Sequence, residues 1–227
     1  MAPPALMKLA YWPGCVSRGF TPELHGSMAL VADRLEIELV TLDRGNCCGA
    51  GVIAEHNQEL ADTLNARTFA LAQQTGEPMM MNICSTCQGS QTECQERLDA
   101  NAEYRAVVNG NLRDEGLTYE KGGTLNKNLL WLLVEDMGLD EVRSRVKRPL
   151  TDLKVGPFYG CYIVRPIDRL GIDSEKPRDA YLGMPVLHLP QLLGLSFGLE
   201  PKELGLNRHV VKPTSVIDWT ESVVASV

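Results

Sequence analysis

Short apolar runs alternate with longer amphipathic stretches along the first part of the chain. The runs Met7–Tyr11, Ile37–Leu42 and Met79–Ile83 are short and apolar, which predicts strands. Over residues 22–35 and 55–74, apolar side chains recur every three or four positions, which predicts helices. This alternation is typical of an α/β fold in which helices cover a largely parallel sheet.

The second part of the chain restarts the pattern of the first. After a further predicted helix at Asn126–Gly138, the segment Lys154–Cys161 shares with Lys8–Cys15 a Lys, an aromatic residue and a final Gly-Cys at equal spacing. We therefore expect two pseudo-duplicated α/β units with short, largely parallel sheets. Residues 1–151 would form a complete unit with a helical tail, and residues 152–227 a truncated second unit.

Composition and charge narrow the class of protein. The chain has 227 residues, of which 44% are hydrophobic and 22% charged, and its net charge is −7. This acidic balance argues against a nucleic-acid or anionic-lipid partner. The sequence has no apolar stretch near the roughly 20 residues of a spanning helix, and Met1–Trp12 lacks the features of a signal peptide. We expect a cytoplasmic protein with no membrane span of its own.

The number and clustering of the cysteines are unusual for such a protein. Seven cysteines are present, and clustered cysteines in a reducing compartment more often bind metal or perform redox chemistry than form disulfides. Six lie in the first 94 residues and one lies far downstream: Cys15, Cys47, Cys48, Cys84, Cys87, Cys94 and Cys161.

Four of these cysteines directly follow predicted strands. Cys15, the pair Cys47 and Cys48, and Cys84 each lie within a few residues of a strand's carboxyl end. Parallel strands bring such ends to one edge of the sheet, where open α/β sheets place their ligand sites. Cys87 lies one helical turn after Cys84. We expect five sulfurs to converge on one pocket, and we expect Cys94 to be a packing residue.

Five thiols suit an opened iron–sulfur cluster better than a cubane. A cubane takes four thiolates, whereas adjacent cysteines can reach two irons or bridge them. The alternative is a zinc site, because a C-x2-C half-site is common to both chemistries. Zinc sites usually pair two such halves, and only one is present here. The residues therefore favour iron–sulfur chemistry and leave zinc as the alternative.

The spacing C-x31-C-C-x35-C-x2-C closely resembles the CCG-domain signature of the B-type subunit of heterodisulfide reductase and its relatives. These relatives include subunits of archaeal-type succinate dehydrogenases, glycolate oxidase iron–sulfur subunits and sulfur-oxidising heterodisulfide reductase-like complexes. Four further segments carry the resemblance: Pro13-Gly14-Cys15, Cys47–Gly51, Gly160-Cys161 with Arg165-Pro166, and Leu187–Leu195.

The resemblance implies one cluster rather than two. In family members with two complete copies, each five-cysteine set holds a non-cubane four-iron, four-sulfur cluster. Here only 21 residues separate Arg165 from Leu187, too few for a second Cys-Cys-Gly and Cys-x-x-Cys, so the second motif is degenerate. The implied cluster and metal ligands are Cys15, Cys47, Cys48, Cys84 and Cys87.

The resemblance further implies an oxidoreductase subunit that is active only in a complex. It would handle a thiol, disulfide or sulfane-sulfur substrate or carrier. It would exchange electrons with a ferredoxin-like iron–sulfur subunit and a flavoprotein subunit, alongside a full-length B-type paralogue. Cys161 is either a relic of the duplication or a free thiol that holds substrate sulfur, and Arg165 shares its segment; these two are the candidate catalytic residues.

Two other functions stay open. The first is a non-catalytic electron-relay or docking subunit of a succinate- or glycolate-oxidoreductase-type complex, which the lack of a basic amphipathic helix makes less favourable for membrane contact. The second is a zinc-bearing interaction module.

Overall fold

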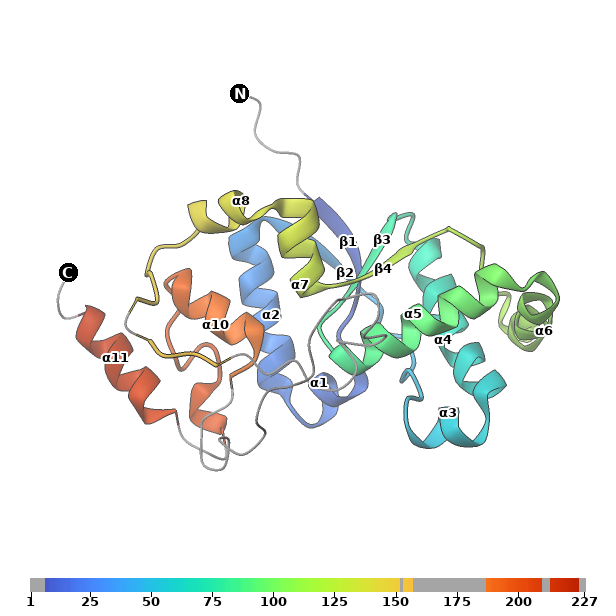
Figure 1. Ribbon diagram of the computed structural model, residues 1–227, viewed down its shortest axis with the longest axis horizontal. Helices are drawn as coiled ribbons and strands as arrows, with labels where there is room; N and C mark the ends of the chain where they lie inside the picture. The colour runs from blue at the N-terminus through green and yellow to red at the C-terminus, as the bar shows by residue number, and fades with distance from the viewer. Residues whose placement is uncertain (1–6, 152, 157–186, 210–212, 225–227) are drawn as a thin grey trace, which may run out of the picture.

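The computed structural model describes residues 7–151, 153–156, 187–209 and 213–224. Its centre is a four-stranded sheet of order β2-β1-β3-β4, in which every pair of neighbours is parallel (Figure 1). The α/β class and the parallel sheet are thus confirmed. The strands are β1 (Met7–Trp12), β2 (Ile37–Thr41), β3 (Met79–Asn82) and β4 (Leu125–Asn128).

Helices cover both faces of the sheet (Figure 1). Because side chains of a strand alternate between faces, Leu9 and Tyr11 of β1 pack in one core with the helix α2, and Ala10 and Trp12 pack in the other. Three helices contribute to this second core. The four helices are α2 (Pro22–Leu35) on the first face, and α4 (Gln58–Gln74), α5 (Ser85–Ala100) and α6 (Ala102–Leu112) on the second.

The direction of the chain connections changes between β1 and β3. The chain leaves β1 through the short helix α1 (Cys15–Gly19) and α2 to reach β2 on one side. It then crosses to the opposite face through α3 (Val52–His56) and α4, and enters β3 on the other side of β1. Connections of β1 and β3 therefore diverge at their carboxyl ends, and open α/β sheets bind ligands at such a point.

The helix predicted at Asn126–Gly138 is wrong in its first turn. Residues up to Asn128 belong to β4, and the helical segment follows as α7 (Leu129–Trp131) and the π-helical η2 (Leu132–Met137). The Asn126 and Asn128 side chains of β4 point inward and hydrogen-bond to Asn82 of β3 at 3.0 and 2.9 Å. This strand is held by buried amides rather than by apolar side chains, so it lacks an apolar pattern.

The single helix predicted over residues 55–74 is two helices. α3 ends at His56, and Asn57 adopts an extended conformation before α4 begins. The Asn57 side-chain oxygen accepts a hydrogen bond from the backbone N–H of Leu60 at 2.9 Å, which caps α4. Residues 55–59 are all polar, so the apolar periodicity gives no information on where one helix ends and the next begins.

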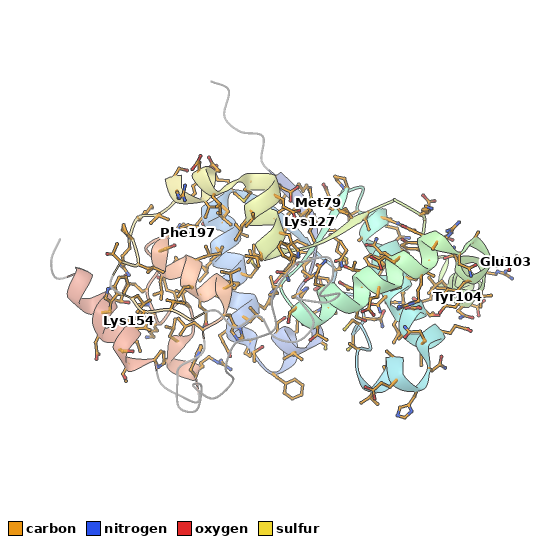
Figure 2. All side chains as sticks on the ribbon, in the orientation of Figure 1. Met79, Glu103, Tyr104, Lys127, Lys154 and Phe197 are labelled. Atoms are coloured by element: carbon orange, nitrogen blue, oxygen red, sulfur yellow. The ribbon has the colours of Figure 1, made fainter. Side chains whose placement is uncertain are left out.

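The C-terminal residues that are described form helices on the α2 side. Phe197 packs in the α2-side core (Figure 2), and the backbone N–H groups of Lys147 and Arg148 both bond to the Ser196 carbonyl. A third apolar cluster joins this region to Leu30 of α2. The elements are α8 (Leu139–Ser144), α10 (Leu189–Ser196), η3 (Leu206–Arg208) and α11 (Thr214–Val224).

The described part of residues 152–227 contains no strand. Most of Lys154–Cys161, which matches the first strand of the complete unit, lies outside the described residues, and the truncated second unit stays a prediction. Among the described residues, no helix combines the length and the apolar character needed to cross a membrane.

Candidate functional site: a five-cysteine pocket

The ends of β1 and β3 bring three cysteines together. Cys15 begins α1, Cys84 is the residue before α5, and Cys87 lies in the first turn of α5. Gly14 has φ +89°, and a Cβ on it would lie 3.5 Å from the Cys84 Cβ and 3.8 Å from the Cys87 Sγ. The positive φ favours glycine at this position, and the two distances show that β1 and β3 end in van der Waals contact range of each other.

The loop after β2 supplies the remaining two thiols. Gly49 and Gly51, both with positive φ, turn the chain from Cys47-Cys48 into α3. The Cys15 Sγ lies 3.4 Å from the Cys47 Sγ, and the Cys48 thiol hydrogen-bonds with Cys87. The structure thus gathers the five predicted cysteines in one place, which we call the five-cysteine pocket (Cys15, Cys47, Cys48, Cys84 and Cys87).

One shared proton sets the charge of the inner thiols. Hydrogen bonding with the Cys87 thiol lowers the pKa of Cys48 to about 7 and that of Cys84 to about 6, and it raises the pKa of Cys87 well above its usual value. The backbone N–H of Ala50 also lowers the pKa of Cys48, and those of Cys87 and Thr86 lower that of Cys84. Near neutral pH the Cys84 thiol is therefore largely ionised and the Cys48 thiol about half ionised, and thiolate is the form that binds metal.

The pocket runs from the interior to the surface. Cys48 and Cys87 are buried, Cys84 is half-buried, and Cys15 and Cys47 are exposed. The pKa of Cys15 is raised to about 11, first because neighbouring protein atoms displace water from its sulfur and then because it hydrogen-bonds to Cys47. A group held by all five sulfurs would be anchored in the core and would reach solvent at the Cys15 and Cys47 side.

Exposed apolar side chains lie close in sequence to the exposed cysteines. Val16 of α1 and Phe20, the residue after α1, are 49% and 85% exposed, and Val52, the first residue of α3, is 74% exposed. They follow Cys15 and the Cys47-Cys48 loop within five residues in the chain. We call them the apolar rim (Val16, Phe20 and Val52).

The donor set fits a polynuclear iron–sulfur group better than one metal ion. Within the described ranges, no three His, Cys, Asp or Glu side chains are arranged around a single ion. The thiols interact instead as Cys15 with Cys47, and as Cys87 with both Cys48 and Cys84. Tetrahedral zinc needs four ligands around one point, whereas a cluster of several irons takes soft thiolates that are spread apart.

The remaining candidate residues lie elsewhere. Cys161 and Arg165 are outside the described residues. Cys94 is fully buried, and its thiol lies 3.6 Å from the Asp62 carbonyl oxygen rather than facing the pocket thiols. This environment fits a packing role for Cys94.

Sequence reasoning missed four polar side chains around the Cys48 loop. Asn65 and Ser90 both donate to the Cys48 carbonyl, at 2.9 and 3.2 Å. The Gln91 amide and the Trp12 indole N–H are buried and have no hydrogen-bond partner. One signal was available, because Asn65 and Gln91 interrupt the otherwise buried, mostly apolar faces of α4 and α5.

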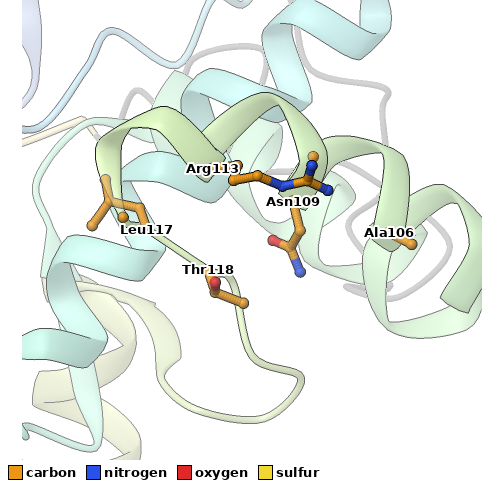
Figure 3. A pocket seen from close by; sticks show the side chains of 7 residues that line it. Ala106, Asn109, Arg113, Leu117 and Thr118 are labelled. Atoms are coloured by element: carbon orange, nitrogen blue, oxygen red, sulfur yellow. The ribbon is translucent and has the colours of Figure 1, made fainter.

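A separate groove lies beside α6 and the turn after it (Figure 3). It has a volume of about 520 Å³ and contains no thiol. Its Asn109 side chain is held by hydrogen bonds to and from the Tyr119 backbone. The groove is not part of the five-cysteine pocket. Its lining residues are Ala106, Asn109, Gly110, Arg113, Gly116, Leu117 and Thr118.

Comparison with known families identifies the pocket region. Residues 9–90 match the model of the CCG cysteine-rich domain, and this range contains all five cysteines of the pocket. The chain is also similar to a solved structure, described as a hypothetical protein from Helicobacter pylori, with a TM-score of 0.63. That similarity, at 15% identity over 92% of this chain and 53% of the other, supports the fold.

Curated relatives have related names. The 8-methylmenaquinol:fumarate reductase membrane anchor subunit of Wolinella succinogenes is 28% identical, covering 92% of this chain and 99% of the relative. The B-type subunit of the ferredoxin/F(420)H(2)-dependent CoB-CoM heterodisulfide reductase of Methanosarcina acetivorans is 28% identical over 76% of this chain. A protein of Archaeoglobus profundus, named as similar to the B-type subunit of heterodisulfide reductase, is 26% identical over 83% of this chain.

These relatives contain residues that this chain lacks. The alignment with the Wolinella succinogenes protein spans 287 positions, although this chain has 227 residues. The chain spans 57% and 62% of the lengths of the Methanosarcina acetivorans and Archaeoglobus profundus proteins.

Proposed function

Because the chain carries a cysteine-rich domain of the CCG family and is similar to the B-type subunit of heterodisulfide reductase, we propose that it is an iron–sulfur subunit of a heterodisulfide reductase-like redox complex. The observation that carries the proposal is the five-cysteine pocket at the carboxyl ends of β1 and β3. The pKa values of two of its inner thiols, Cys48 and Cys84, are lowered toward neutral pH, which favours the thiolate form that binds metal.

The proposed cofactor is one non-cubane four-iron, four-sulfur cluster held by Cys15, Cys47, Cys48, Cys84 and Cys87. When bound, it supplies one-electron transfer and an iron site for a thiol, disulfide or sulfane sulfur. The adjacent residues Cys47 and Cys48 face different parts of the pocket, because Cys47 contacts Cys15 while Cys48 contacts Cys87. Five ligands with one such divergent pair support an opened cluster rather than a cubane.

The protein groups that surround the pocket differ between its buried side and its exposed side. On the buried side, backbone N–H groups at the start of α5 and at Ala50 stabilise the negative charge of the thiolates. On the exposed side, Cys15 and Cys47 are followed in the chain by the exposed residues of the apolar rim. A sulfur substrate or a redox partner would approach from this side.

The proposed partners are the components that such a complex requires. They are a ferredoxin-like iron–sulfur subunit, a flavoprotein subunit and a full-length B-type paralogue, acting on a sulfur-containing substrate or carrier in the cytoplasm. Cys161 and Arg165 are the proposed catalytic residues beyond the cluster. Replacing Cys161 by Ser tests this assignment, and full activity in the reconstituted complex would remove it.

Metal and sulfide analysis of protein purified without oxygen tests the cofactor. We expect about four irons and a similar amount of acid-labile sulfide per chain, as in other four-iron clusters. Zinc without sulfide would contradict the proposal and support the interaction module. Electron paramagnetic resonance spectra with and without an added thiol then test substrate binding, because a cluster with an iron site for sulfur must change its signal.

A second function has one specific observation in its favour. The Wolinella succinogenes relative, of which this chain covers 99%, is named as a membrane anchor subunit of a fumarate reductase. The alternative is therefore an electron-relay or docking subunit of a succinate- or glycolate-oxidoreductase-type complex. An iron-loaded protein whose resonance signal does not respond to thiols would support this alternative.

A further inference from the structure

We infer that Asn65 and Ser90 are positioning residues, which hold the Cys48 carbonyl and so fix the direction of the Cys48 thiol relative to that of the adjacent Cys47. The inference rests on the proposed function only for the use of these thiols as ligands. We call Asn65 and Ser90 the Cys48 clamp.

The clamp closes on one backbone atom from two helices. The Asn65 Nδ2 group of α4 lies 2.9 Å from the Cys48 carbonyl oxygen, and the Ser90 Oγ of α5 lies 3.2 Å from the same oxygen. The second Nδ2 hydrogen of Asn65 bonds to the Ala61 carbonyl at 2.9 Å. Asn65 is 1% exposed and Ser90 8% exposed, so water does not compete for these bonds.

The loop that carries Cys47 and Cys48 depends on such side-chain contacts. Residues 42–51 belong to no helix or strand, and Gly49 and Gly51 give the backbone unusual freedom. Rotation of the peptide group between Cys48 and Gly49 would turn the Cys48 backbone and change the direction of its side chain. Two donors on its carbonyl oxygen oppose that rotation.

The clamp also relates the two halves of the pocket to each other. Ser90 lies one turn after Cys87 on α5, the helix that also begins next to Cys84. Besides bonding to the Cys48 carbonyl, the Ser90 hydroxyl interacts with the Cys48 sulfur. The helix α5 and the residue that precedes it thus supply two of the thiols, and the same helix holds the loop that carries two others.

Packing alone does not account for Asn65. Its Oδ1 is buried without a hydrogen-bond partner, as is the whole amide of Gln91, the neighbour of Ser90. Unpaired buried polar groups are destabilising, and an apolar side chain avoids that cost. The donor that Asn65 presents to the loop is the feature that an apolar residue lacks.

The test uses reduced, iron-free protein, so it does not depend on a cluster. Each cysteine is alkylated with iodoacetamide at one pH, and mass spectrometry gives the rate at Cys48 relative to Cys47. Losing two hydrogen bonds in Asn65→Ala/Ser90→Ala should raise this ratio about tenfold, as the loop opens more often. Ser90→Thr keeps a hydroxyl and should keep the wild-type ratio.

A matched control separates positioning from general loosening. Asn109 on α6 makes the same kind of bond, from its Nδ2 to the Tyr119 carbonyl at 3.1 Å, in a region without thiols. Asn109→Ala should leave the ratio unchanged. An unchanged ratio in the folded double variant, or an equal rise in Asn109→Ala, overturns the inference. If the double variant does not fold, the single variants Ser90→Ala and Ser90→Thr decide in the same way.

A second readout connects the clamp to the bound group. In iron-loaded protein, Ser90→Ala should shift the reduction potential and the resonance signal, because hydrogen bonds near the ligand sulfurs tune such clusters, whereas Ser90→Thr should resemble wild type. A reduction potential and a resonance signal in Ser90→Ala that equal those of wild type contradict the inference. If wild-type protein binds no iron, the proposed function fails. The alkylation ratio of Cys48 to Cys47 still tests whether Asn65 and Ser90 position the loop.

Discussion

Two polar clusters lie at opposite ends of α5 and differ in how completely their groups are paired. At the far end, Asp62 is fully buried, yet its two oxygens accept hydrogen bonds from Arg97 at 2.9 and 2.7 Å and from Tyr104 at 2.9 Å (Figure 2 labels Tyr104). The Gln58 side-chain amide donates a further hydrogen bond to Asp62 Oδ1 at 3.1 Å. We call these four residues the Asp62 cluster.

The five-cysteine pocket, at the start of the same helix, is incompletely paired. Three buried side chains in this part of the protein have polar atoms without a partner: Trp12 and Asn65, which pack with the Cys48 loop, and Gln91 of α5, the neighbour of Ser90. The thiols themselves share protons with one another. A fully satisfied buried network rigidifies a fold, whereas unsatisfied groups indicate a place for an ion, water or bound group. The comparison therefore fits a structural role for the Asp62 cluster and supports the binding role that we propose for the pocket.

Removing a pocket thiol should have the largest effect, and it should act on binding. We expect Cys84→Ser to lose most of its iron and sulfide, because a hydroxyl is a much poorer ligand for iron than a thiolate. Cys94→Ser is the matched control on the same helix and should keep the iron content of wild type. Anaerobic metal analysis of both proteins measures the difference. Equal iron loss in both variants would show that Cys94 is as important for iron binding as Cys84.

Removing Asp62 should act on stability alone. Asp62→Ala leaves the Arg97 guanidinium and the Tyr104 hydroxyl without their partner, and we expect a loss of about 2 to 3 kcal/mol in the free energy of unfolding. The partly exposed Arg97 can turn toward water, which keeps the loss below that of a fully buried pair. Denaturant unfolding measures the change. The iron content per folded molecule should stay that of wild type, and a parallel loss of iron would mean that the two clusters are coupled.

The pocket was easier to predict than its supports. Cys15, Cys48 and Cys84 follow strands, and parallel strands end at one edge, so residue order alone was enough to bring them together. The partner of Asn65 and Ser90 is a backbone oxygen that lies 17 and 42 positions away in the chain. Every residue has such an oxygen, so no residue type in the sequence indicates the contact.

The strand β4 was missed for a related reason. Its inward positions Asn126 and Asn128 are polar, and they become favourable only because Asn82 of the neighbouring strand pairs with both. An apolar pattern reports burial against a core, but it does not report burial inside a network of amides. Contacts between distant polar side chains thus mark the limit of what periodicity predicts here.

The shared proton of the pocket gives a testable pH dependence. In iron-free protein, alkylation of Cys84 should reach half its maximal rate near pH 6 and that of Cys48 near pH 7, while Cys87 should need pH well above 9. Cys87→Ala removes the hydrogen-bond donor, so both lowered pKa values should rise toward their usual range.

The same pKa values predict the sign of a stability change. Because the pKa of Cys84 is lower in the folded than in the unfolded protein, its contribution is fully present above the unfolded value of about 9 and is lost as pH falls toward 6. Cys87→Ala should weaken this contribution. Midpoints for Cys48 and Cys84 that do not move in Cys87→Ala would show that another group sets their charge.

The smallest effects should have opposite signs at the two ends of α5. Gln91→Met replaces an unpaired buried amide by an apolar side chain of similar size, and it should raise the free energy of unfolding of iron-free protein by about 1 kcal/mol. Tyr104→Phe deletes a hydroxyl that is paired with Asp62, and it should lower that free energy by about 1 kcal/mol. Equilibrium unfolding of the two variants beside wild type measures both changes. If Gln91→Met loses as much stability as Tyr104→Phe, Gln91 has a hydrogen-bond partner in the iron-free protein. Gln91 would then not belong to the unpaired groups that distinguish the pocket from the Asp62 cluster.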